Sequence, residues 1–156
     1  MQIEFPGFFD LQVNGFAGID FNAPCSPEQL QHAIEAQRKT GVTQFLPTII
    51  TTSLEHFVSC AHAIARFSDP AIVGIHMEGP YISPEDGPRG AHPKTNVYAA
   101  SIEDFKLRQD AAQGKIVLVT LAPEVPNAIT LIEYLVANNI KVAIGHTAAS
   151  DRKSVV

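Results

Sequence analysis

The chain has 156 residues, of which 46% are hydrophobic and 17% are charged, and its formal net charge is -5. This length is close to the commonest size of one domain, and the hydrophobic fraction excludes a disordered chain because it can supply a sizeable core. The acidic balance argues against a nucleic-acid partner, and the lack of a long apolar run argues against a membrane span.

Short apolar runs with strand character alternate along the chain with amphipathic stretches that carry helix signals. In chain order we predict strand Phe8–Val13, helix Pro27–Thr40, strand Val42–Ile50, helix Ser53–Phe67, strand Ala71–Ile75, helix Ile102–Gln113, strand Ile116–Leu121, helix Ala128–Asn138 and strand Lys141–Ile144. The connection Glu78–Ser101 is rich in Pro and Gly, and a loop of that length is usually a functional one.

Local signals predict where the helices begin and which side chains they bury. Ser26 with Gln29 forms a capping box for the first helix, and Thr52 with Glu55 forms one for the second. In the fourth helix we expect a buried stripe of Ile129, Ile132, Leu135 and Val136. The phenylalanines expected in the core are Phe8, Phe9, Phe21, Phe45 and Phe57.

Strands that are apolar almost throughout, each followed by a helix, predict an α/β fold with a parallel sheet. Two architectures fit this pattern: an open wound sheet, or part of a (β/α)8 TIM barrel. The glycine fingerprint of a dinucleotide site is missing after the first strand, where the sequence is Leu11-Gln12-Val13-Asn14-Gly15. A complete barrel takes about 250 residues, so this chain would supply about five of its strands.

Polar side chains gather where the predicted strands end, which is where parallel α/β proteins place their chemistry. His76 and Glu78 are two positions apart after the third strand, so their side chains share a face, and His146 follows the last strand. Two imidazoles and a carboxylate are a ligand set for zinc or a similar divalent ion. Such an ion lowers the pKa of a bound water toward about 7, which produces a nucleophile near neutral pH.

Ordinary structural roles are the alternatives for these residues. His76 could hydrogen-bond within the sheet and hold Glu78 instead of binding metal. Glu124 could be an acid at a helix N-terminus, and Gln12 and Asn14 could be turn residues. The residues alone leave these roles open.

Short motifs of one known family run in order through nearly the whole chain: Pro6–Gly15, Leu46–Thr48, His76–Tyr81, Gly90–His92, Thr120–Glu124 and Gly145–Thr147. Together they resemble the N-acetylglucosamine-6-phosphate deacetylase family, which belongs to the amidohydrolase superfamily of metal-dependent (β/α)8 barrels. The resemblance implies that Glu78 and His146 bind the metal. It also implies that Ala91 and His92 contact the sugar substrate.

Two departures from the family pattern shape what we expect of this chain. Gln12 and Asn14 stand where many amidohydrolases carry His-x-His and hold two metals, which implies a single divalent ion, with zinc the expected one. A second metal-binding histidine and a catalytic aspartate are expected beyond Val156, so no catalytic residue is assigned within the chain. We therefore expect residues 1–156 to be the N-terminal portion of the catalytic barrel, without the small β domain and the C-terminal half, and inactive or nearly so alone.

The resemblance implies hydrolysis of N-acetylglucosamine 6-phosphate to glucosamine 6-phosphate and acetate. The alternatives are a deacetylase for another amino-sugar phosphate, such as N-acetylgalactosamine 6-phosphate, or a non-enzymatic half-barrel module that pairs through open sheet edges. The two cysteines, Cys25 and Cys60, are too few for a disulfide framework, which favours a reduced, cytoplasmic protein. We expect the full-length protein to be a homo-oligomer, most simply a dimer.

Overall fold

The computed structural model describes residues 6–150, which fold around a five-stranded sheet with all neighbours parallel. Its strands lie side by side in chain order: β1 (Phe8–Val13), β4 (Val42–Ile50), β5 (Ile75–Glu78), β6 (Ile116–Leu121) and β7 (Lys141–Ile144). A short antiparallel pair, β2 (Gly15–Phe16) and β3 (Ile19–Asp20), follows β1.

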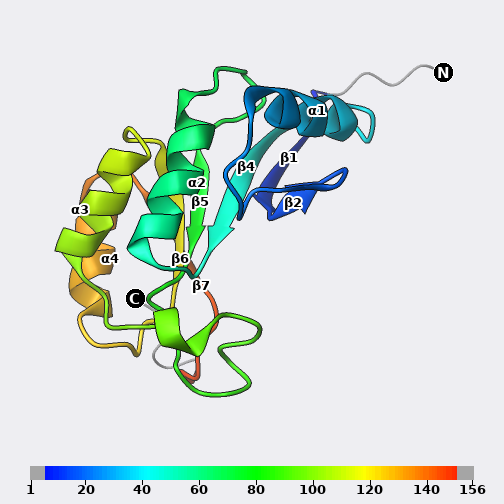
Figure 1. Cartoon of the computed structure of the whole chain (residues 1–156). Coiled ribbons are helices and arrows are strands. Elements are labelled where there is room, and N and C mark those ends of the chain that lie inside the picture. Colours follow the sequence, from blue (N-terminus) through cyan, green and yellow to red (C-terminus); the bar gives the residue numbers. More distant parts are fainter. Residues whose placement is uncertain (1–5, 151–156) are drawn as a thin grey trace.

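The helices follow the strands and lie along the outer side of the curled sheet (Figure 1). They are α1 (Pro27–Arg38), α2 (Leu54–Arg66), α3 (Ile102–Ala111) and α4 (Ala128–Ala137), and a single 3-10 turn, η1 (Lys94–Asn96), lies in the long loop after β5. Strands inside and helices outside make a curled half-barrel. This confirms the predicted α/β class and the partial barrel of five strands.

The two faces of the sheet carry different chemistry. The positions that face the helices are apolar and form the core, among them Phe45, Ile49, Ile75, Met77, Val119 and Leu121. The alternate positions face the inside of the curl, and neighbouring strands pair them in register as Thr48 with His76 and Glu78 with Thr120. These four polar side chains are all buried. A polar band therefore crosses the inner face near the carboxyl ends of the strands.

Of the two capping boxes predicted from the sequence, the one at α1 is confirmed and the one at α2 is wrong. Ser26 and Gln29 form the predicted reciprocal capping box of α1. At α2 the cap is Ser53, whose hydroxyl accepts from the His56 backbone N–H, so the predicted box of Thr52 and Glu55 is wrong by one residue. Both Thr52 and Ser53 have a hydroxyl that can cap a helix, and in the structure Ser53 is the one that does so.

The strand predicted at Ala71–Ile75 forms later, at Ile75–Glu78. The prediction ended the strand where polar residues began. Parallel pairing with Thr48–Ile50 on one side and with β6 on the other instead satisfies the backbone through His76 and Glu78. Ile72 forms only an isolated bridge to Phe45.

Some side chains predicted to be buried are exposed. Phe8 and Phe9 are 60% and 47% exposed because β1 is an edge of the sheet in the described residues, whereas Phe21, Phe45 and Phe57 lie in the core as predicted. In α4 the stripe is shifted: the helix buries Ala128, Leu131, Ile132 and Leu135, and it leaves Ile129 and Val136 exposed.

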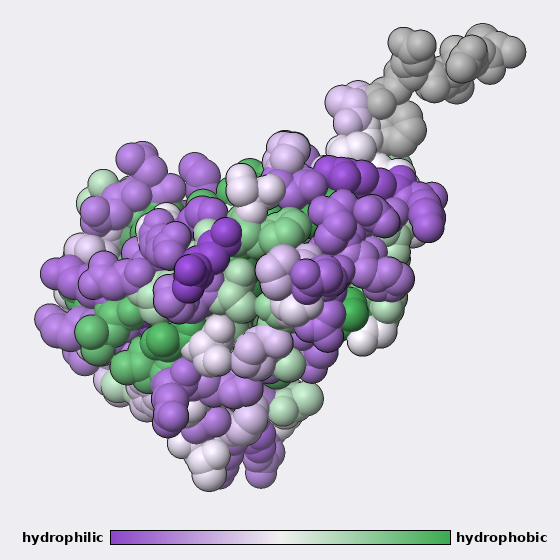
Figure 2. Space-filling model, turned by 45° about the horizontal axis from the view of Figure 1, so that its top comes forward, coloured by the Kyte–Doolittle hydropathy of each residue, from purple (hydrophilic) through white to green (hydrophobic). Residues whose placement is uncertain are grey.

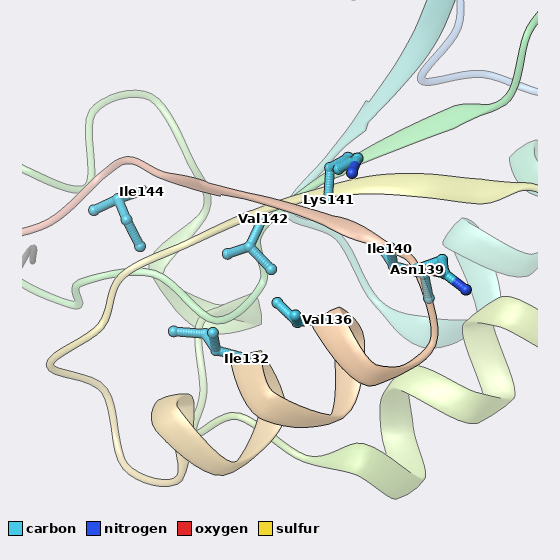
Figure 3. A pocket seen from close by; sticks show the side chains of 7 residues that line it. All are labelled: Ile132, Val136, Asn139, Ile140, Lys141, Val142 and Ile144. Carbon is cyan, nitrogen blue, oxygen red and sulfur yellow. The ribbon is translucent and has the colours of Figure 1, made fainter. Parts of the chain in front are cut away.

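The face of the molecule in Figure 2 is largely hydrophilic, with apolar residues gathered in patches between polar ones. A groove of about 430 Å³ lies between α4 and the outer edge of the sheet, β7, and it is lined mainly by aliphatic side chains such as Ile132, Val136 and Val142 (Figure 3). Among the described helices, none combines the length and apolar character needed to cross a membrane.

Candidate metal centre

Glu78 and His146 meet at the carboxyl ends of the strands, as the sequence predicts. Glu78 is the last residue of β5, and His146 follows β7 by two residues. His146 Nε2 lies 3.0 Å from Glu78 Oε1, although the two residues are 68 positions apart in the sequence. The parallel order β5-β6-β7 brings them together, because it aligns the same ends of neighbouring strands.

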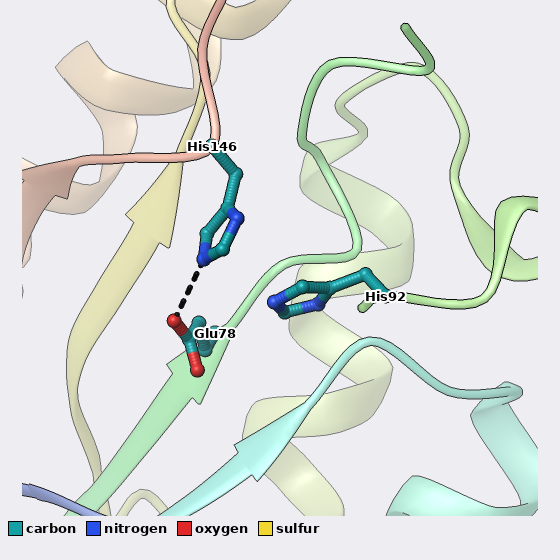
Figure 4. Close-up of side chains that lie close together, drawn as sticks. All are labelled: Glu78, His92 and His146. Carbon is teal, nitrogen blue, oxygen red and sulfur yellow. Dashed lines mark hydrogen bonds and ion pairs between the residues drawn. The ribbon is translucent and has the colours of Figure 1, made fainter. Parts of the chain in front are cut away.

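His92 joins them from the long loop after β5. One ligand atom from each of Glu78, His92 and His146 can be chosen so that all lie within 4.8 Å of one another. Figure 4 shows both imidazole rings beside the Glu78 carboxylate, with His146 coming from the segment after β7 and His92 from the long loop. The rings of His92 and His146 lie edge to face with centroids 4.2 Å apart, and Glu78 and His92 are both 5% exposed.

The hydrogen bonds of His146 leave a place for a cation beside Glu78. The Nδ1 atom of His146 lies 3.2 Å from the carbonyl oxygen of Pro88, which can only accept, so this nitrogen carries a proton and donates it. In a neutral ring the other nitrogen, Nε2, is then a bare acceptor that faces a carboxylate oxygen. Two acceptors at this distance need a proton or a metal ion between them. The orientation of His146 therefore suits a metal ligand, and it equally suits an ion pair with Glu78 when the ring is protonated.

His92 is buried differently. Its Nδ1 lies 2.8 Å from the hydroxyl of the buried Thr51, and the Arg89 guanidinium donates to its backbone carbonyl. Burial, reinforced by the neighbouring His146, lowers the pKa of His92, so its ring is neutral at pH 7.

The donor set fits a divalent metal. Two imidazoles and one carboxylate, largely buried and close together, are a ligand combination of catalytic zinc sites. Neutral imidazole nitrogen and ionised carboxylate oxygen also suit other divalent ions of the first transition row. Glu78, His92 and His146 therefore line a candidate metal centre, in which each can offer a ligand atom.

His76 was expected to converge on this centre and does not. It is 2% exposed, its Nδ1 lies 3.1 Å from the carbonyl oxygen of Leu11, and its Nε2 lies 2.7 Å from the Thr120 hydroxyl. Both ring nitrogens are therefore used inside the polar band, and burial lowers the pKa of the imidazole. The structural alternative for His76, hydrogen bonding within the sheet, fits these contacts.

The other residues singled out in the sequence lie around the centre. Ala91 is exposed beside the buried His92, and Gln12 and Asn14 are exposed at the end of β1. Glu124 accepts from the Thr147 hydroxyl and from the backbone N–H of Ala148, so it holds the segment after His146.

Asp104, which no sequence pattern singled out, holds both ends of the long loop. One of its carboxylate oxygens accepts from the Tyr81 hydroxyl at 2.6 Å and from Arg108 Nε at 2.8 Å, and the Tyr98 hydroxyl lies 3.2 Å from the same oxygen. Arg108 is fully buried against the ring of Phe57. The loop that carries His92 therefore begins and ends on one carboxylate of α3.

A comparison with known families defines the class of this protein. The profile of the amidohydrolase family matches residues 3–152, so the chain belongs to the amidohydrolase family. This family is metal-dependent, which agrees with the presence of a candidate centre at the strand ends.

Individual relatives are amino-sugar-phosphate deacetylases. The chain is 38% identical to N-acetylgalactosamine-6-phosphate deacetylase of Shewanella sp. (strain ANA-3), over 92% of this chain and 36% of the relative. It is 35% identical to N-acetylglucosamine-6-phosphate deacetylase of Bos taurus, over 92% of this chain and 37% of the relative. A solved mutant of N-acetyl-D-glucosamine-6-phosphate deacetylase from Mycobacterium smegmatis, in complex with N-acetyl-D-glucosamine-6-phosphate, matches with a TM-score of 0.87 and 29% identity, over 96% of this chain and 39% of that one. The chain thus spans well under half the length of these relatives.

Proposed function

We propose that this chain provides the first part of the catalytic barrel of a metal-dependent deacetylase that acts on N-acetylglucosamine 6-phosphate. The observation that carries the proposal is the convergence of Glu78 and His146, whose carboxylate oxygen and imidazole nitrogen lie 3.0 Å apart, with His92 beside them. A carboxylate and a neutral imidazole placed this close together can bind one divalent ion between them. The relatives, which are named as amino-sugar-phosphate deacetylases, supply the substrate class.

In this proposal Glu78 and His146 bind one divalent ion, and zinc is the ion we expect. The bound ion would polarise the acetyl carbonyl and activate a water molecule. His92 and the exposed Ala91 beside it would contact the sugar from the loop. Both edge strands, β1 and β7, lack a neighbour within the described residues, so further strands would be needed to close the barrel. We infer that the remaining ligand and the general acid/base come from that part.

A second substrate has specific support. The Shewanella relative, at 38% identity, is named for N-acetylgalactosamine 6-phosphate, which differs from the glucose epimer at one carbon of the sugar. None of the contacts at Glu78, His92 or His146 distinguishes the two sugars. A substrate panel containing both epimers would separate them.

The metal centre is tested first, on the chain itself. Wild type, Glu78→Gln and His146→Gln are titrated with Zn²⁺ in competition with a chromophoric chelator, and Glu55→Gln and His62→Gln serve as controls because these side chains are exposed on α2. We expect the two centre variants to lose at least about tenfold in affinity and the controls to match wild type. Equal affinity in all five proteins would refute the proposal.

Activity is tested next, by measuring acetate release from both sugar phosphates. We expect the chain alone to release little acetate, whereas a chimera in which it replaces the matching segment of the Shewanella relative should release acetate steadily. Glu78→Gln should abolish that release. Turnover by the chain alone that depends on Glu78 would refute the inferred need for further strands, and an inactive but folded, metal-loaded chimera would refute the substrate class.

The cellular compartment and the oligomeric state of the protein are part of the same proposal. Cys25 and Cys60 are both buried free thiols, which fits a reducing, cytoplasmic compartment. A homo-oligomer of the full-length protein stays a prediction, which light scattering would check.

A further inference from the structure

Thr51 connects the two candidate residues that come from different segments, Glu78 and His92. It is the residue after β4, it is 2% exposed, and its side chain lies beside the end of β5. Its hydroxyl oxygen lies 2.8 Å from His92 Nδ1 and 3.4 Å from the carbonyl oxygen of Glu78. Among the described residues, Thr51 is the hydrogen-bond partner of the His92 ring.

The backbone makes room for this hydroxyl. Gly79 has a φ of 76°, in the left-handed region, and a Cβ atom at this position would overlap Thr51 Oγ1. Glycine at position 79 therefore permits the close approach of Thr51 to the chain just after Glu78. The contact between Thr51 and His92 depends on this approach, because the same hydroxyl reaches both segments.

The distances decide where the single hydroxyl proton goes. A hydroxyl donates one hydrogen bond, and O–H bonds to a good acceptor are about 2.5–3.0 Å long. The separation of 2.8 Å from His92 Nδ1 lies in this range, whereas the Glu78 carbonyl at 3.4 Å lies beyond it. Thr51 therefore donates to Nδ1, which must be unprotonated in the neutral ring. The proton of that ring then sits on Nε2.

The surroundings of Nε2 favour the same assignment. Figure 4 shows the outer nitrogen of the His92 ring pointing toward the Glu78 carboxylate. A carboxylate accepts hydrogen bonds and stabilises an N–H that faces it. His146 has the opposite arrangement, since its Nδ1 donates to the Pro88 carbonyl and its Nε2 is the bare nitrogen. The two histidines of the centre thus present different groups to the same space.

We propose that Thr51 is a positioning residue that fixes His92 in the tautomer with its proton on Nε2. In the substrate contact already proposed for His92, this tautomer makes the ring an N–H donor, and it leaves the metal to Glu78 and His146. The inference rests on the proposed function for the identity of the acceptor, an amide carbonyl or a similar oxygen. It separates a metal-binding histidine, His146, from a ligand-binding one, His92.

Nitrogen-15 NMR of the histidine rings tests the tautomer directly in the metal-free chain. At about pH 8, where a histidine is neutral, we expect His92 of the wild type to carry its proton on Nε2. Thr51→Val keeps the shape and removes the hydroxyl, so the Nδ1 signal should shift and the second tautomer should appear. Thr51→Ser should restore the wild-type signals. Thr48→Val is the matched control, because Thr48 is equally buried on β4 but contacts His76.

Metal affinity tests the assignment of roles. We expect His92→Gln and Thr51→Val to bind Zn²⁺ within about threefold of wild type, while His146→Gln loses at least about tenfold. A wild-type ring with its proton on Nδ1, unchanged His92 signals in Thr51→Val, or a loss in His92→Gln as large as in His146→Gln would each overturn the inference. The wild-type measurement decides even if a variant does not fold. Failure of all proteins to bind Zn²⁺, with the tautomer as expected, would refute the metal centre and support the role of Thr51.

Discussion

The histidines at the strand ends differ in what their ring nitrogens contact, and this decides what each can do. His76 uses both nitrogens inside the polar band, with Leu11 and Thr120. His146 donates from Nδ1 to Pro88 and presents Nε2 to Glu78. A buried imidazole whose two nitrogens are satisfied is a structural residue, whereas one with a bare nitrogen beside a carboxylate is prepared for a cation.

His76 makes the stability of the folded chain depend on pH. Burial lowers its pKa in the folded state below the value of about 6.5 that an unfolded histidine has, so the unfolded chain binds more protons between the two values. Its contribution to stability is therefore complete above about pH 6.5 and declines as the pH falls below that value. Urea unfolding in the presence of a chelator should show less loss of stability on acidification for His76→Gln than for wild type. Parallel pH profiles for the two proteins would contradict this.

Sequence reasoning brought Glu78 and His146 together because both lie where a strand ends, and the ends of parallel strands gather at one edge. Their metal-binding roles were implied by the family resemblance. Sequence reasoning could not decide the role of His76, because a strand pattern gives the face of a residue and not the partners of its nitrogens. It also gave no sign of Thr51, a common residue type at a common place. Its contact with His92 depends on how a long loop folds back, and loop closure leaves no periodic signal.

At the scale of elements, the sequence predicts which segments are strands and which are helices. It predicts the first and last residues of these elements less accurately. Ser26 and Gln29 at α1 were recognisable because both halves of the capping box are present. At α2, two adjacent hydroxyl residues compete for the same role. In α4 nearly every position is apolar, so hydrophobicity cannot say which side faces the sheet.

The cap of α2 can be tested by two alanine substitutions at neighbouring positions. Ser53→Ala should lower the free energy of unfolding by about 1 kcal/mol, because it removes the acceptor for the His56 N–H. Thr52→Ala should change it by less than about 0.5 kcal/mol. Urea unfolding curves of the two variants provide the comparison, and an equal or reversed effect would contradict the observed cap.

The orientation of α4 can be tested in the same way. Leu131 is fully buried, so Leu131→Ala should cost about 2–5 kcal/mol in unfolding free energy. Val136 is 61% exposed, so Val136→Ala should cost less than about 0.5 kcal/mol. Thermal or urea unfolding would measure both. A larger loss for Val136→Ala would mean that the stripe first predicted from the sequence is the buried one.

At the scale of the whole molecule, the described residues form a sheet with two edges, and its inner face has an apolar part in addition to the polar band. Phe9, Leu11, Leu46 and Leu118 are among the residues that line a cavity of about 240 Å³ on that surface. Open strand edges next to exposed apolar side chains favour association. The same features that would receive further barrel strands can therefore pair with another copy.

We expect the isolated chain to self-associate, and light scattering over a range of protein concentrations would show it. Leu11→Lys, on the edge strand β1, should reduce the mean mass because a charge at an open edge opposes pairing. Leu107→Lys on α3 is the control, since the two leucines are 54% and 55% exposed. A monomer at all concentrations, or an equal effect of the two substitutions, would contradict association through the edge.

The attachment of the long loop to Asp104 bears on how such a protein can diversify. Tyr81 and Tyr98 are tied to the same carboxylate, so the entry and exit of the loop stay in place whatever lies between them. Insertions and deletions between His92 and Tyr98 can then occur without displacing β5, which carries Glu78, or the Pro88 carbonyl that contacts His146. Length changes in that part of the loop are thereby uncoupled from the sheet beneath it.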